Sequence, residues 1–249
     1  MRGVSNRVSP WFLVLVLVAV SGSVLTTLGT PVALTAGVVL LVLGGWAVSL
    51  CLHEFGHAYV AYRSGDLSVR DKGYLTLDIR RYTDPVLSFG LPVVFLLLGG
   101  IPLPGGAVWI NHGAIRSRGA RSLVSLAGPA TNLVLGAVLT VLVATVAMPG
   151  GLAIGLSCLA LIQVLAFVLN ILPVPGLDGF GVLEPYLSMP ARRLAARVRP
   201  WAPLVLFVLL IGVPGVSAVF FDLAYTVFDA VGGSGRLASL GYGELLFWR

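Results

Sequence analysis

The chain has 249 residues, of which 57 % are hydrophobic and only 10 % are charged, and its mean hydropathy is +0.98. Soluble domains carry about a quarter charged residues, so this composition excludes a soluble globular protein and indicates a polytopic α-helical membrane protein. The net charge of +6 does not indicate nucleic-acid binding, because the basic residues are spread over the polar stretches between apolar runs.

The first predicted membrane helix is the apolar run 11–28, which follows Arg2 and Arg7. A cleaved signal peptide is the alternative interpretation, but the run is long for the hydrophobic part of a signal peptide and no A-x-A cleavage site follows it. We therefore expect a retained transmembrane helix, and we assign residues 1–31 to it.

The second apolar run, from residue 32 to about residue 62, contains the motif His53-Glu54-Phe55-Gly56-His57. In a helix, two histidines four residues apart project from one face, where they suit two ligands of a zinc ion, and the adjacent Glu54 can serve as a general base. An acidic side chain inside hydrocarbon costs about 2.5–3.5 kcal/mol on insertion scales, so such residues are typical of functional sites. Hydrogen bonding between helices is the structural alternative for the histidines.

The remaining apolar runs are residues 86–98, 123–148, 152–172 and 201–221. The run 86–98 falls short of the ~20 residues that a spanning helix needs, so we interpret it as a re-entrant or interfacial segment. Residues 1–10, 63–121 and 177–200 then share one side of the membrane and contain 14 of the 16 Lys and Arg residues, whereas the turns 29–31 and 149–151 contain none. This distribution predicts a cytoplasmic N-terminus and a site that opens toward the cytoplasm. Residues 192–199 form a basic amphipathic stretch that we expect to anchor to anionic lipid.

Two histidines leave a zinc ion short of protein ligands, because catalytic sites usually supply three. Asp178 is the candidate for the third, at the inner end of the fifth apolar run, where Pro173 and Pro175 must break the helix. Broken backbone is tolerated at membrane depth where it lines a cavity, and the topology above brings Asp178 to the depth of the HExxH motif. A helix cap or a salt bridge to a loop arginine is the alternative role for Asp178. We expect Cys51 to point away from the metal, and His112 to lie in a loop at the membrane interface.

Three motifs occur in a recognisable order: HEFGH at 53–57, GPATN at 128–132 and NILPVPGLDG at 170–179. With this set the chain resembles the site-2 protease family of intramembrane zinc metalloproteases. The resemblance covers roughly residues 45–185, and it implies an all-α polytopic membrane fold of five to six transmembrane helices with a three-helix catalytic core. We place that core at residues 32–190, with a small re-entrant or β-hairpin element at 86–110, and assign residues 191–249 to a C-terminal transmembrane segment and tail.

The resemblance also implies the roles of individual residues. His53, His57 and Asp178 would bind Zn²⁺, and Glu54 would activate water. Asn132 and Asn170 would line the site and hold or polarise the substrate backbone. Many family members carry a PDZ domain or a CBS pair, but this chain has no polar segment large enough for either.

The expected function is a zinc endopeptidase that cleaves transmembrane segments of membrane proteins, such as a membrane-tethered regulator or a signal-peptide remnant. A metal transporter is one alternative, because paired histidines and an aspartate can form a transport site. A non-catalytic membrane chaperone or adaptor is another. A prenyl-protein peptidase, which also uses HExxH, is disfavoured by the LDG sequence.

Overall fold

The computed structural model describes residues 8–82 and 108–248, and every regular element in these two ranges is a helix. Four helices form the body of the molecule: α1 (Pro10–Leu25), α2 (Pro31–Ser64), α6 (Arg118–Thr145) and α7 (Gly150–Asn170). Three short helices follow α2: α3 (Ser68–Asp71), η1 (Tyr74–Thr76) and α4 (Ile79–Tyr82). The chain after α7 forms α8 (Asp178–Leu183), η3 (Glu184–Tyr186), α9 (Met189–Val198), α10 (Ala202–Gly212), α11 (Pro214–Ala230) and α12 (Gly235–Leu245).

Capping side chains mark where the first two helices begin. The Ser9 hydroxyl accepts a hydrogen bond from the N–H of Trp11, and the Thr30 hydroxyl accepts one from the N–H of Ala33. A proline follows each cap at the first helical position, where a missing N–H leaves no helical hydrogen bond unmade. α2 ends at Ser64 and is capped by Gly65, whose φ of 122° is open to glycine and strained for other residues.

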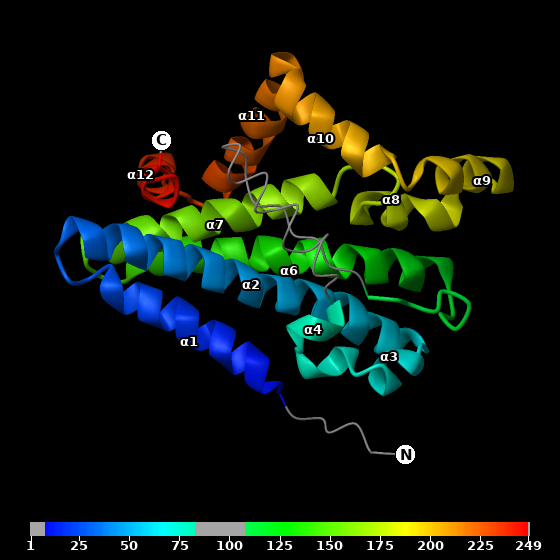
Figure 1. The fold of residues 1–249 in the computed structure, drawn as a ribbon. Coiled ribbons are helices and arrows are strands. Elements are labelled where there is room, and N and C mark those ends of the chain that lie inside the picture. Colours follow the sequence, from blue (N-terminus) through cyan, green and yellow to red (C-terminus); the bar gives the residue numbers. More distant parts are fainter. Residues whose placement is uncertain (1–7, 83–107, 249) are drawn as a thin grey trace.

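The core consists of α2, α6 and α7, each of which contacts the other two, while α1 packs along α2 on the outside (Figure 1). Small residues allow the close approach of α1 and α2. A Cβ atom added at Gly22, Gly37 or Gly44 would overlap the backbone of the opposite helix. Small interface residues are typical of helix pairs in membranes, where packing replaces the hydrophobic effect as the main source of association.

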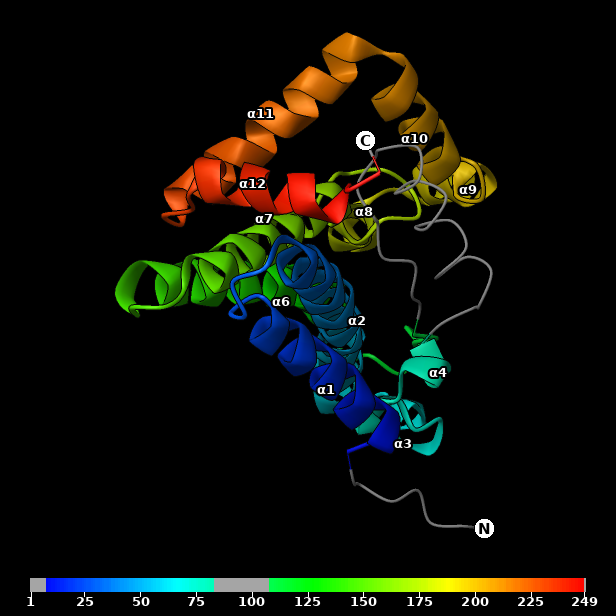
Figure 2. The ribbon, with the colours of Figure 1, turned by 60° about the vertical axis from the view of Figure 1, so that its left-hand side comes forward.

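The apolar run 201–221, expected as one continuous helix, is broken in the structure. α10 ends at Gly212, α11 begins at Pro214, and the two helices meet at the apex of an inverted V (Figure 1, Figure 2). Pro214 has no backbone N–H, and its ring disfavours the helical conformation at Val213, which has a ψ of 100°. The run therefore forms the two arms of this V instead of one continuous helix (Figure 2).

The C-terminal tail after Asp222, which is only weakly apolar, is also largely helical. It completes α11 and forms α12, which packs on α7 and α2 (Figure 2). Gly241 lies against Cys158 of α7, and Leu245 is buried in the core. The hydroxyl of Thr35 donates a hydrogen bond of 2.5 Å to the Glu244 carboxylate. The tail is thus part of the helical body.

α2, α6 and α7 are long and apolar enough to cross a bilayer, and α9 with α10 forms a fourth candidate span, bent by 62°. α1 is apolar but has 16 residues, short of the ~20 of a typical span. The all-α polytopic membrane fold is therefore confirmed, and the five to six crossings expected from the sequence compare with three or four candidate spans in the described ranges. Apart from residues 108–110, the expected element at 86–110 lies outside the described residues. The boundaries at residues 31 and 190 stay predictions.

Candidate metal centre

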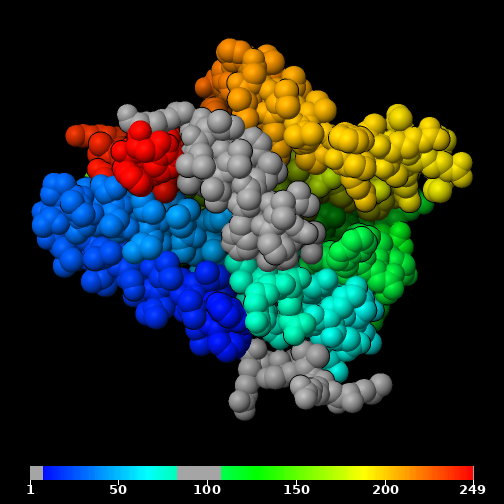
Figure 3. Space-filling view, in the orientation of Figure 1, coloured from blue at the N-terminus to red at the C-terminus, as the bar shows by residue number. Residues whose placement is uncertain are grey.

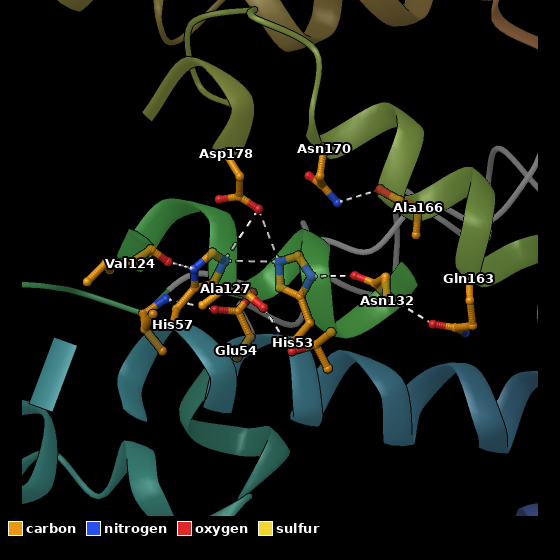
Figure 4. A network of polar contacts seen from close by, with 12 residues as sticks. His53, Glu54, His57, Val124, Ala127, Asn132, Gln163, Ala166, Asn170 and Asp178 are labelled. Atoms are coloured by element: carbon orange, nitrogen blue, oxygen red, sulfur yellow. Dashed lines mark hydrogen bonds and ion pairs between the residues drawn. The ribbon is translucent and has the colours of Figure 1, made fainter. Parts of the chain in front are cut away.

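The HExxH motif lies in the last third of α2, on the side that packs against α6 (Figure 4). His53, Glu54 and His57 are 5 %, 3 % and 5 % exposed. Because the two histidines are one helical turn apart, both rings point from α2 toward the beginning of α8. Their planes lie at 79° to each other. The local geometry of a single helix thus forms half of the site.

Asp178 approaches the histidines from another part of the chain. α7 ends at Asn170, and Pro173 and Pro175 prevent its continuation. The chain then turns through Gly176, which has a φ of 105°, and α8 begins with Asp178 facing α2 (Figure 4). Because the chain turns back after α7, the Asp178 carboxylate lies next to the histidines of the HExxH motif.

The spacing of the three donor groups suits a metal ion. One carboxylate oxygen of Asp178 lies 3.2 Å from Nε2 of His53 and 3.3 Å from Nε2 of His57, and the two Nε2 atoms are 3.1 Å apart. Ligands placed tetrahedrally at about 2.0–2.1 Å from a zinc ion are ~3.3 Å from one another. The three atoms thus match one face of a zinc tetrahedron, which leaves the fourth corner for water or substrate.

The hydrogen bonds on the far side of each ring favour this interpretation. Nδ1 of His57 donates to the backbone carbonyl of Val124 at 2.7 Å, because a carbonyl oxygen can only accept. Nδ1 of His53 lies 2.5 Å from Oδ1 of Asn132 and donates to it in the same way. With a proton on each Nδ1, the neutral rings direct the lone pairs of both Nε2 atoms toward the carboxylate. Such a convergence of electron pairs is suited to a cation.

Gly128 provides the space for these rings. It lies on α6 opposite the histidines, and a Cβ atom at this position would overlap Nε2 of both His53 and His57. The glycine of the GPATN motif is thus explained by the lack of space for a side chain at this position. Asn132, four residues later on the same helix face, is the residue that contacts His53.

Glu54 lies beside the donor cluster and has a backbone partner. Its Oε2 accepts a hydrogen bond of 3.1 Å from the N–H of Val108, at the start of the segment 108–116. Asp66 holds this segment beside the end of α2 by accepting the N–H of Asn111 at 2.7 Å. Burial acts to raise the pKa of Asp66, but the hydrogen bonds from Ser68 and Asn111 outweigh it and hold the pKa below its ordinary value. The acceptor is therefore a carboxylate at neutral pH.

The two asparagines expected at the site differ in their surroundings. Asn132 is 2 % exposed and lies behind His53, with its Nδ2 donating to Oε1 of Gln163 at 2.8 Å (Figure 4). Asn170 lies near the metal centre at the end of α7, and its Nδ2 donates to the carbonyl of Ala166 in its own helix. Sequence reasoning missed Gln163, although an uncharged polar residue in the middle of the most apolar spanning helix is a usable signal.

The other candidates examined from the sequence lie away from the cluster. Cys51, which was expected to point away from the metal, is fully buried among apolar side chains. His112 is an exposed residue of a turn. Neither belongs to the only group of three metal-ligating side chains found in residues 8–82 and 108–248, which consists of His53, His57 and Asp178.

No family model matches the chain, and no solved structure matches it. Relatives in three bacteria are nevertheless similar. A Mycolicibacterium smegmatis protein named "Putative zinc metalloprotease Rip2" is 45 % identical over 98 % of this chain and 95 % of its own length. The protein of that name from Mycobacterium tuberculosis is 46 % identical over the same shares. A Bacillus subtilis protein named "Putative zinc metalloprotease YwhC" is 32 % identical over 66 % of this chain and 77 % of its own length.

These relatives agree with the sequence motifs and with the chemistry of the donor cluster. Two imidazoles and a carboxylate are typical ligands of catalytic zinc, and a glutamate lies beside them. The chain belongs to the site-2 protease family of zinc metalloproteases.

Proposed function

We propose that this protein is an intramembrane endopeptidase that hydrolyses peptide bonds in the transmembrane segments of other membrane proteins. In this proposal His53, His57 and Asp178 hold Zn²⁺, and Glu54 is the general base. The observation that carries the proposal is the convergence of three donor atoms from α2 and α8, within 4.8 Å of one another, beside a buried glutamate.

The chemistry follows from the positions of these side chains. When bound, zinc supplies Lewis acidity that polarises the scissile carbonyl and makes water a nucleophile at neutral pH. Glu54 takes the proton of the attacking water and delivers it to the leaving amine. The hydrogen bond from Val108 N–H holds one carboxylate oxygen of Glu54, which leaves the other oxygen for the water.

The depth of the site supports a substrate inside the membrane. Arg63 lies at the end of α2, and His57 and His53 precede it by six and ten residues. At about 1.5 Å of rise per residue, the histidines lie roughly 9 and 15 Å below the level of Arg63. A substrate helix would have to unwind locally, because its scissile carbonyl is otherwise paired within the helix.

The partners and the orientation are part of the same proposal. The distribution of Lys and Arg supports a cytoplasmic N-terminus and a site that opens toward the cytoplasm. Membrane-tethered regulators and signal-peptide remnants are the substrate classes that fit, since both present a single apolar helix to an enzyme within the bilayer.

The decisive variant is Glu54→Gln, which keeps the size of the side chain and an oxygen to accept the Val108 N–H. We expect purified Glu54→Gln enzyme to bind zinc as the wild type does and to cleave single-span substrates at least 100-fold more slowly, because a general base contributes about 10²–10⁴-fold to the rate. Metal analysis and a gel-based cleavage assay measure the two quantities.

Glu244→Gln is the matched control, because it makes the same chemical change on α12, where the carboxylate accepts the Thr35 hydroxyl. It should leave cleavage unchanged. Cleavage by Glu54→Gln at the wild-type rate would disprove the general-base role. Zinc flux into proteoliposomes without any cleavage by the wild type would replace the protease proposal with the transporter alternative.

A further inference from the structure

Gln163 lies in the middle of α7 and is 1 % exposed. An amide buried among apolar side chains is unfavourable unless its polar atoms are hydrogen-bonded. Here the oxygen is bonded and the nitrogen is not: Oε1 accepts the Nδ2 proton of Asn132 at 2.8 Å, and Nε2 has no partner. A leucine would fill this place without an unpaired donor, so packing does not explain the residue.

The bonded oxygen is one end of a chain of hydrogen bonds that leads to the metal centre. Gln163 accepts from Asn132, and Asn132 accepts from Nδ1 of His53, while Nε2 of the same ring faces Asp178 (Figure 4). The chain links α7 to α2 through α6, so that all three core helices contribute to the orientation of one imidazole.

Asn132 alone does not determine the direction of these hydrogen bonds. Its amide can turn over, which exchanges Oδ1 and Nδ2 at nearly the same positions. With Nδ2 toward the ring, Nδ1 of His53 would have to accept, the ring proton would move to Nε2, and Nε2 would have no lone pair for a metal. With Oε1 of Gln163 toward Asn132, as in this structure, a turn of the Asn132 amide alone would place two amide oxygens against each other.

We propose that Gln163 is a positioning residue for the metal centre. It fixes the orientation of the Asn132 amide, and Asn132 in turn keeps the proton of His53 on Nδ1 and leaves Nε2 free to bind zinc. This inference rests on the proposed zinc ligation by His53, and it is independent of whether the enzyme cleaves transmembrane segments.

A double-mutant cycle with zinc affinity as the readout tests the proposal. Gln163→Leu removes the acceptor in an apolar setting, and Asn132→Leu removes the link through which it acts. Zinc affinity of purified, metal-stripped protein in detergent is measured by competition with a chromophoric chelator. Outer hydrogen-bond partners of metal ligands contribute about 10–100-fold to metal affinity. We expect Gln163→Leu to weaken zinc binding about 10-fold in the wild-type background and to have less than about a 2-fold effect in Asn132→Leu.

Two further variants separate positioning from packing. Gln163→Glu retains an oxygen toward Asn132 and should bind zinc within a few-fold of the wild type. Thr140→Val is the matched control, because Thr140 is a buried residue on α6 whose hydroxyl has no partner, and its replacement should leave zinc affinity unchanged. Thermal unfolding of the metal-free variants verifies that each is folded.

The outcomes are distinct. An equal loss of zinc affinity from Gln163→Leu in both backgrounds would mean that the residue acts by packing, and wild-type affinity in Gln163→Leu would mean that it does not act on the site. Either result overturns the inference and leaves the protease proposal intact. If the zinc affinities follow the expected pattern but the wild-type protein cleaves no membrane substrate, the proposed function alone is overturned.

Discussion

Gly128 illustrates how closely the individual residues of the metal centre depend on available space. The two imidazoles fill the volume that any side chain at position 128 would occupy. The same helix provides Val124 and Asn132, whose oxygens accept the two Nδ1 protons. At the scale of residues, α6 therefore positions the proposed ligands on α2, although it contributes no donor to the cluster itself.

Replacing Gly128 by alanine should consequently remove metal binding. The added methyl group overlaps both Nε2 atoms, so either the rings rotate away from Asp178 or α6 moves outward. We expect zinc content near zero by metal analysis and at least a 100-fold loss of cleavage, in protein that still elutes as a folded species. Gly119→Ala is the control on the same helix, where the nearest neighbour of an added Cβ atom is the Tyr186 hydroxyl at 3.9 Å. Normal zinc content in Gly128→Ala would contradict the proposed ligand geometry.

At the scale of elements, α9 differs from the long apolar helices because it is basic and amphipathic. It stands at the edge of the molecule, beyond α8, and makes few contacts with the core helices (Figure 1, Figure 3). Arg192 donates to the carbonyl of Pro185, and Arg199 forms an ion pair with Glu184 at 2.8 Å. The remaining exposed side chains of the helix include two arginines without a partner in the described chain and the apolar residues next to them: Arg193, Arg197, Met189, Leu194 and Val198. This combination is typical of a helix that lies in the membrane interface.

Arg193 and Arg197 should therefore bind anionic headgroups. Each basic residue near an anionic surface contributes about 1 kcal/mol, and 1 kcal/mol corresponds to roughly 2–4 °C in the unfolding midpoint of a chain of this size. We expect wild-type protein to unfold several degrees higher in phosphatidylglycerol-containing nanodiscs than in phosphatidylcholine ones, and Arg193→Gln/Arg197→Gln to lose most of this difference. Arg236→Gln, an exposed arginine on α12, should keep it. An undiminished lipid effect in the double variant would exclude α9 as the contact.

At the scale of the whole molecule, the basic loops lie at one end of the helical body and the turns without Lys or Arg lie at the other (Figure 1). The α1–α2 turn and the α6–α7 turn lie together at one end, where Gly151 is in contact with the carbonyl of Thr26 (Figure 1). The opposite end carries α3, α4 and α9. The metal centre lies nearer to this second, basic end, because the histidines fall in the last third of α2.

Cysteine labelling in cells checks the resulting orientation. Cys51 and Cys158 are fully buried, so single exposed cysteines introduced elsewhere should dominate the signal. With a membrane-impermeant maleimide, Ala147→Cys in the α6–α7 turn should react in intact cells, whereas Ala196→Cys on α9 should react only after the cells are permeabilised. The reverse pattern would show that the basic end faces outward and would overturn the proposed opening of the site toward the cytoplasm.

Much of the site could be predicted because its chemistry is local in the sequence. The HExxH spacing places His53 and His57 on one face of any helix, and Asp178 is the carboxylate that an apolar, proline-broken segment presents near the membrane. Asn132 was expected to line the site and to hold or polarise the substrate backbone, and this role stays a prediction. The structure adds that both ends of its amide have a protein partner, His53 and Gln163. These partners lie on two other helices, and the spacing of residues along one segment does not predict which side chains of other helices will be in contact.

The same distinction applies to the fold. Hydrophobicity and charge by themselves determined the membrane class and the long core helices, and the four-residue spacing placed the two histidines on one helix face. Each of these features depends on neighbouring residues along one segment. Only the tertiary structure decided that α12 packs on α7, that Gly128 lies against both histidines, and that Gln163 forms a hydrogen bond with Asn132. These features depend on distances between segments that are far apart in the chain, and helix packing fixes those distances.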